Sequence, residues 1–220
     1  TREVEKLKSS IEKETQRIEA FSDGVFAIVI TLLIFNVRLP DPAAVTANGL
    51  LAELAKSWTI YLAFAASFFF VLVMWINHHR LFTIIRRSDN NLMLLNGLLL
   101  FGVTVVPFPT SIVAAYLLDP QQQAAVFIYN GWFFLVAIMF QLLWRYAAHN
   151  NRLFSHAVDP AITRHIARSY NIGLVLYLAA VLIDIISPPV SLAISIGLAV
   201  FFAIPNRQVQ QLMMTSDTVF

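Results

Sequence analysis

The chain runs from Arg17-Ile18-Glu19-Ala20-Phe21-Ser22-Asp23 directly into the apolar segment Gly24-Val25-Phe26-Ala27-Ile28-Val29-Ile30-Thr31-Leu32-Leu33-Ile34-Phe35. Such a segment is typical of a membrane helix, and Asp23 places an acid at its beginning. An ionisable group inside a membrane helix costs a few kcal/mol or more, so we expect it to face protein or water and to have a partner. The stretch therefore predicts a membrane helix whose first turns carry a functional element.

Composition places the chain among polytopic membrane proteins. Of its 220 residues, 58% are hydrophobic and 13% are charged. In soluble domains roughly 45–50% of residues are apolar and about 25% are charged. Apolar runs of sufficient length predict an all-α fold with six transmembrane helices. The predicted spans lie near residues 17–38, 57–79, 90–118, 121–147, 164–186 and 188–206. We expect one six-helix domain over residues 1–220, and we expect Pro107 and Pro109 to kink the third span.

The distribution of basic residues predicts the orientation. Thirteen of the fifteen Lys and Arg residues fall on the side of the N-terminus, and only Arg38 and Lys56 fall opposite. Because cytoplasmic loops are enriched in Lys and Arg, both termini are expected to be cytoplasmic, with residues 1–16 as a charged helix and 207–220 as a tail. This topology explains the pI of about 9.0 without a nucleic-acid partner.

The sequence offers no conventional active site, so we expect no enzyme and no cofactor. Cysteine is absent, and neither a Gly-rich phosphate loop nor a nucleophile elbow is found. His78 and His79 together with Asp23 have the ligand types of a divalent metal site. Adjacent residues on a helix point about 100° apart, however, so both imidazoles cannot easily bind one ion. We therefore predict no metal site.

A polar network is the more economical interpretation of the acid. The topology places His78 and His79 at the cytoplasmic end of the second span, at the depth of Asp23 and Ser22. A carboxylate, a hydroxyl and an imidazole there are expected to satisfy one another and to fix the angle between the first two helices. Arg17 is expected to join from the interface, because long basic side chains can extend along an apolar surface.

Beyond Asp23 the first helix carries Ile28, Thr31, Leu32 and Phe35 at spacings typical of one helical stripe. Lipid contact or bundle packing is the ordinary interpretation of such a stripe. If four such helices surrounded an axis, the same residues would form aliphatic rings and one ring of hydroxyls. That arrangement would be a hydrophobic constriction able to close by dewetting.

These residues resemble a known family. Arg-x-x-x-Phe-Ser-Asp at 17–23, the continuation Gly-Val-Phe-Ala-Ile, Trp75-x-x-His78-His79-x-x-Phe82, and Asn90 with Pro107-Phe108 are similar to bacterial members of the transmembrane protein 175 potassium channel family. The resemblance covers essentially the whole chain. It implies a homotetramer of six-helix subunits in the plasma membrane of a bacterium, which conducts potassium and other monovalent cations.

The resemblance also implies roles for individual residues. The first helix would line the pore, with Ile28 as the narrowest ring, Thr31 as a polar ring, and Leu32 and Phe35 on the following turns. Phe35 stands where the family pattern suggests Leu. Arg17, Phe21, Ser22 and Asp23 would fix this helix through Trp75, His78 and His79. The Thr-Val-Gly-Tyr-Gly filter of ordinary potassium channels is absent from the chain.

Two other functions remain open on the sequence. A proton-coupled secondary transporter would exchange protons between Asp23 and His78. A scaffold or receptor would conduct no ions and would tolerate substitution of Ile28. A second intramembrane acid, Asp184, has no evident partner and is expected to reach the membrane interface.

Overall fold

The computed structural model describes residues 2–154, 158 and 160–203, with side chains described from residue 15 onward. The predicted tail 207–220 and the last residues of the sixth predicted span, 204–206, lie outside this part of the chain. Within it the protein is all-helical, as predicted, and forms no β-strand; one isolated bridge joins Ile85 to Phe154.

Five helical segments are long and apolar enough to cross a membrane: Thr15–Asn36, Trp58–Ile84, Asn90–Tyr116, Gln122–Asn151 and Pro160–Asp184. They correspond to the first five predicted spans. The sixth predicted span corresponds to α9, Pro188–Ala203, which is described over sixteen residues and is shorter than the others.

The first helix is continuous from the charged N-terminal segment into the apolar stretch. α1 covers Arg2–Leu32 and passes into a 3₁₀ turn, η1, over Leu33–Asn36. Two short helices follow, α2 (Pro42–Asn48) and α3 (Leu50–Lys56), joined at Gly49, whose φ of 87° favours glycine. α4 then spans Trp58–Ile84, five residues beyond the predicted end of the second span.

The third span is broken at the predicted position. α5 covers Asn90–Thr104 and α6 covers Pro107–Tyr116, with a turn at residues 105–106 between them. Pro107 and Pro109 lack the backbone N–H groups that would continue the ladder across this point, which explains the break. The Trp132 indole donates a hydrogen bond to the Gly102 carbonyl at 2.8 Å, close to the break.

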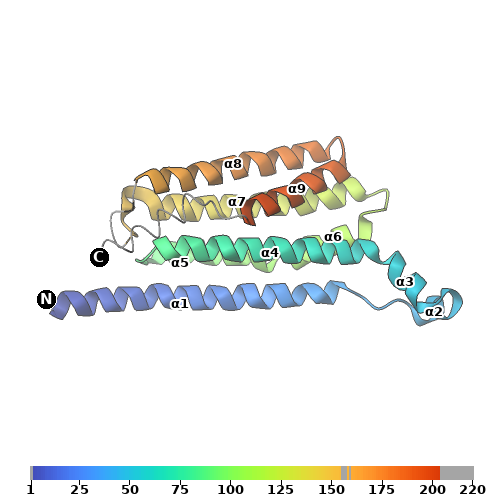
Figure 1. Ribbon diagram of the computed structural model, residues 1–220, viewed down its shortest axis with the longest axis horizontal. Helices are drawn as coiled ribbons and strands as arrows, with labels where there is room; N and C mark the ends of the chain where they lie inside the picture. The colour runs from blue at the N-terminus through green and yellow to red at the C-terminus, as the bar shows by residue number, and fades with distance from the viewer. Residues whose placement is uncertain (1, 155–157, 159, 204–220) are drawn as a thin grey trace.

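The remaining helices are α7 (Gln122–Ala148), a short 3₁₀ turn η2 (His149–Asn151), α8 (Pro160–Asp184) and α9. α7 is the centre of the bundle: it packs against α5 and α6 on one side and α8 and α9 on the other. Its Tyr129, Phe133 and Trp144 are among the largest fully buried side chains. α1 lies at one edge of the bundle (Figure 1) and packs against α4 and α5.

The links between helices gather at two ends of the bundle. Residues 85–89 and 149–154 lie at the same end as the start of α1, whereas 37–57, 117–121 and 185–187 lie at the opposite end (Figure 1). At the first end Asp89 caps α5 and accepts hydrogen bonds from the Leu92 amide at 2.8 Å, the Tyr146 hydroxyl at 2.7 Å and Arg152 at 3.0 Å. Partial burial raises the pKa of Asp89, but these donors and the Arg152 charge together hold it below its usual value.

Candidate functional site

The first transmembrane helix has one face packed against the bundle and one face open. Ser22, Phe26, Val29 and Leu33 are buried and recur at spacings of four, three and four residues, so they form one stripe along the helix. This stripe packs against α4 and α5. The tertiary contacts of α1 therefore fix the direction in which its other residues point.

A buried hydrogen-bond network joins α1, α4 and α5 through Asn96. The Asn96 Nδ2 donates to Ser22 Oγ at 3.0 Å, and Ser22 in turn donates to the Ile18 carbonyl at 2.8 Å. The Asn96 Oδ1 lies 2.8 Å from His78 Nε2. Because this oxygen can only accept, His78 carries its proton on Nε2 and donates it. The His78 ring lies between Phe26 and Phe82, with ring centroids 5.4 Å and 4.5 Å away.

Asp23 makes a separate contact with α4. Its Oδ1 accepts a hydrogen bond from the Trp75 indole Nε1 at 2.8 Å, and His79 stacks on Trp75 with ring centroids 6.1 Å apart. The carboxylate is half-buried. Trp75 therefore satisfies one oxygen of the acid without neutralising its charge.

From the sequence we expected Asp23, Ser22 and His78 to bond directly to one another, and the structure shows a different arrangement. The structure divides the group into two networks: Ser22 and His78 meet only through Asn96, and Asp23 binds Trp75. Adjacent residues on α1 point about 100° apart, so Ser22 is directed to α5 and Asp23 to α4. Asn96 is the residue that sequence reasoning missed, although a buried amide inside a membrane span is itself a signal, since such groups are expected to bond across helices.

Arg17 and Phe21 lie outside both networks. Both side chains are exposed, Phe21 with 67% of its surface accessible, and no hydrogen bond joins Arg17 to Asp23 in the described part of the chain. Their role in fixing α1 stays a prediction, since no hydrogen bond or ion pair among the described residues involves either side chain.

The predicted pore residues all lie on the open face of the first transmembrane segment, with Ile28, Thr31 and Leu32 on α1 and Phe35 on η1. The exposed fractions are 59% for Ile28, 40% for Leu32 and 76% for Phe35, and Thr31 is also exposed. The Thr31 hydroxyl donates to the Ile28 carbonyl at 2.8 Å. Its proton is therefore used within α1, and its oxygen lone pairs face outward as acceptors.

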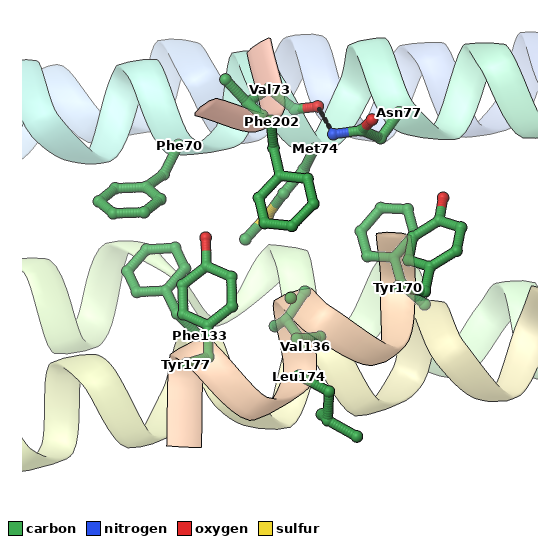
Figure 2. Close-up of a pocket in the computed structure, with 13 residues that line it drawn as sticks. Phe70, Val73, Met74, Asn77, Phe133, Val136, Tyr170, Leu174, Tyr177 and Phe202 are labelled. Atoms are coloured by element: carbon green, nitrogen blue, oxygen red, sulfur yellow. Dashed lines mark hydrogen bonds between the residues drawn. The ribbon is translucent and has the colours of Figure 1, made fainter. Parts of the chain in front are cut away.

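A hollow lies between α4, α7, α8 and α9, away from the open face of α1 (Figure 2). Rings of Phe70, Phe133 and Phe202 surround it, and Tyr170 and Tyr177 enter it from α8. Its polar lining consists of Asn77, Tyr170 and Tyr177, and no carboxylate, imidazole or amine among the described residues lines it. Among the described residues, no group of three or more His, Asp or Glu side chains gathers as a metal site would require.

Known proteins resemble this chain over the helices that carry both networks. The family model of the endosomal/lysosomal potassium channel TMEM175 matches residues 17–107. A potassium channel of Chamaesiphon minutus is 45% identical over 196 residues, which cover 89% of this chain and 97% of that protein. The crystal structure of a lysosomal potassium-selective channel TMEM175 homolog from Chamaesiphon minutus superposes with a TM-score of 0.80 at 44% identity, covering 87% of this chain and 97% of the other.

A more distant relative has a different name. The endosomal/lysosomal proton channel TMEM175 of Homo sapiens is 35% identical over 136 residues, which cover 59% of this chain and 27% of the human protein. The family match covers α1 from residue 17 onward together with all of α4 and α5, the three helices that the Asn96 network joins.

Proposed function

Because this chain belongs to the TMEM175 family of channels, we propose that it is a cation channel that prefers potassium and assembles from four copies around the α1 helices. The open face of α1 is the observation that carries this proposal. Ile28, Leu32 and Phe35 have large exposed apolar surfaces, whereas Phe26, Val29 and Leu33 on the packed face of the same span belong to the buried core. Such a face needs a second copy or lipid to cover it.

Thr31 favours a pore over lipid contact. Its hydroxyl lies on the exposed face between the aliphatic residues, with its proton already donated to the helix backbone. Lone pairs directed away from the bundle are suited to replace part of the hydration shell of a cation. In a fourfold arrangement, Ile28 would form the narrowest ring and Thr31 a ring of four acceptors beside it.

The gate would then be hydrophobic. Aliphatic rings exclude water when narrow, so conduction would require the Ile28 ring to widen enough for a partly hydrated ion. Four hydroxyls supply a weaker field than a stack of carbonyl cages, so we expect modest discrimination between potassium and sodium. The two networks at Ser22 and Asp23 would hold the cytoplasmic half of α1 in position while the gate moves.

The proposed topology has six spans, with α9 as the sixth, and both termini in the cytoplasm of a bacterial cell. The distribution of basic residues supports this topology. Arg86, Arg87, Arg145 and Arg152 lie at the end of the bundle where α1 begins, and only Arg38 and Lys56 lie at the opposite end of the described chain. The chain would form a single channel domain in the plasma membrane.

A proton-coupled transporter finds less support in the geometry. Exchange of a proton between Asp23 and His78 requires them to share a hydrogen bond or a water, and each instead has its own partner. The human relative is named a proton channel, so proton flux belongs in the test of this proposal.

Flux into liposomes tests the channel. We expect purified protein to conduct potassium faster than sodium down a gradient, and Ile28→Asn to raise the flux because an amide hydrates the narrowest ring. Leu182→Asn is the matched control, since Leu182 is an exposed aliphatic residue on α8. Proton flux is followed in parallel with a pH-sensitive dye.

Equal effects of the Ile28 and Leu182 substitutions would remove Ile28 from the gate. Absence of any passive flux, while an ionophore control works, would contradict the channel proposal itself.

A further inference from the structure

A second polar cluster lies between α7, α8 and α9, away from α1. It consists of Asn130 on α7, Asp184 on α8, and Ser191 and Ser195 on α9, and all four side chains are completely buried. The expectation that Asp184 reaches the membrane interface is therefore wrong. Asp184 ends α8, but α9 folds back immediately at Pro188 and covers it.

Two hydrogen bonds fix the centre of this cluster. Asn130 Nδ2 donates to Ser191 Oγ at 2.6 Å, and Ser191 donates to the Ala180 carbonyl at 2.7 Å. Asp184 lies one turn from Ala180 on α8, and Ser195 lies one turn from Ser191 on α9. Side chains on a helix lean toward its N-terminus. α8 and α9 are antiparallel, so their N-termini lie at opposite ends. The Asp184 side chain therefore leans toward Ala180, and the Ser195 side chain leans toward Ser191, so both are directed to the level of the hydrogen bond between Ser191 and Ala180.

The remaining atoms of the cluster are unpartnered oxygens. Both oxygens of Asp184, the Oδ1 of Asn130 and the Oγ of Ser195 are buried without a hydrogen-bond partner among the described residues. Buried polar atoms are nearly always satisfied by protein, water or an ion. Here three acceptor oxygens, two of Asp184 and one of Asn130, face a single free hydroxyl proton, that of Ser195, because Ser191 donates its own proton to the backbone. An excess of acceptors around one negative charge favours a cation.

No basic side chain of the surrounding helices can supply that charge. Asp184 is the only charged residue in 169–203, and 122–144 contain none. Arg168 is sixteen residues before Asp184, which is about 24 Å along a helix. At the same end of the bundle, Lys56 pairs with Glu53, and Arg38 lines a different hollow with Asn36 and Tyr116.

We propose that Asp184, Asn130 and Ser195 bind one monovalent alkali cation, with water completing its shell. The ligands are all oxygens, which suits hard cations. A single carboxylate balances one positive charge, whereas a divalent ion would be left undercompensated in a buried site. The cation would join the ends of α7, α8 and α9. This site is independent of the pore, because none of its residues belongs to α1.

Thermal unfolding of the purified protein tests this site. Choline chloride is replaced by sodium, potassium or rubidium chloride at constant ionic strength and constant pH. We expect the Tm of the wild type to rise saturably, by about 3 °C or more at ten times the dissociation constant. Asp184→Asn should abolish the rise. In choline it should unfold at a higher temperature than the wild type, because a buried charge has been removed.

Two controls separate this site from other cation effects. Asp119→Asn removes an exposed acid at the same end of the bundle, and Thr31→Val alters the proposed pore. Both should keep the rise in Tm. An unchanged wild-type Tm in choline, sodium and potassium would overturn the proposal, and so would a rise that persists in Asp184→Asn. Stability that falls with increasing pH, without dependence on the cation, would show a neutral acid and would also overturn it.

Crystals of the wild type soaked in thallium give a readout that needs no variant to fold. We expect an anomalous peak between Asp184, Asn130 and Ser195. A map with thallium peaks elsewhere and none at this position would contradict the site.

Discussion

The Asn96 network and the Asp184 cluster are both buried and polar, and three helices contribute to each. They differ in how many of their polar atoms have a hydrogen-bond partner. At Asn96, the amide donor, the amide acceptor, the Ser22 hydroxyl and the His78 Nε2 each have a partner. At Asp184, four oxygens have none among the described residues. A network whose hydrogen bonds are all made holds helices in one arrangement. A cluster with more acceptors than donors can instead bind a ligand that supplies positive charge. Burial and polarity alone therefore do not separate a positioning element from a binding site.

Asn96→Ala should break the satisfied network most severely. It removes hydrogen bonds to Ser22 and His78 and leaves a buried imidazole without an acceptor, so we expect a loss of about 2 kcal/mol in the free energy of unfolding. Titration with sodium dodecyl sulfate in mixed micelles measures this loss. Asn91→Ala, an exposed position on the same helix, is the matched control. Equal losses in the two variants would show that the network contributes nothing.

Asp89 offers a partly exposed network for comparison with both buried ones. Asp89→Ala removes the cap of α5 and should cost about 1 kcal/mol, whereas Asp89→Asn keeps an acceptor and should cost less. Its pKa is lowered in the folded state, so the ionic contribution is present above the unfolded pKa of about 3.9 and is lost as the pH falls through the folded pKa.

Unfolding free energies of the wild type and Asp89→Asn between about pH 6 and pH 3 measure that contribution. The difference between the two proteins should narrow toward the acidic end. A constant difference would show that the charge of Asp89 contributes nothing to stability.

Two serines sharpen the comparison directly. Ser22 both donates and accepts hydrogen bonds, whereas the Ser195 hydroxyl has no hydrogen-bond partner among the residues that the structure describes. Ser22→Ala should cost about 0.6 kcal/mol, a typical value for a hydrogen bond between membrane helices. Ser195→Ala should be neutral in choline and should weaken the stabilisation by potassium or sodium. If Ser195→Ala is the more damaging of the two in choline, the distinction between the clusters is wrong.

Thr31→Val should have the smallest effect. The substitution keeps the shape of the side chain and removes the acceptor, and a loss of about 0.5 kcal/mol in potassium stabilisation corresponds to roughly a twofold lower preference over sodium. Thr104→Val on α5 is the control, because Thr104 is also exposed and donates to a backbone carbonyl at 2.8 Å. The potassium to sodium flux ratio in liposomes should change only for Thr31→Val.

Much of the fold followed from the sequence because the membrane restricts what a chain can form. Apolar runs must become helices in lipid, since only helices and closed barrels satisfy every backbone group there. The break near Pro107 was predictable for the same reason, because proline removes a specific backbone donor. Hydropathy predicted helix ends less accurately. It placed the end of the second span near residue 79, whereas α4 continues through Arg80 and Thr83 to Ile84.

The candidate site was only partly predictable. Ser22, Asp23, Trp75 and His78 could be selected as polar groups at one depth in the membrane, but their partners depended on the direction in which each helix faced. Asn96 was missed because its run contains no charge, and Asp184 was misplaced because nothing before the fold showed that α9 covers it.

The sequence by itself determined that this protein is helical and crosses a membrane, and it determined the chemistry of the first helix. Length, hydropathy and residue spacing act along one chain and need no knowledge of its neighbours. Tertiary structure decided which face of α1 is buried, that Asn96 joins Ser22 to His78, and that Asp184 is enclosed with unpartnered oxygens. These properties depend on the rotation and packing of several helices, so only the assembled bundle specifies them.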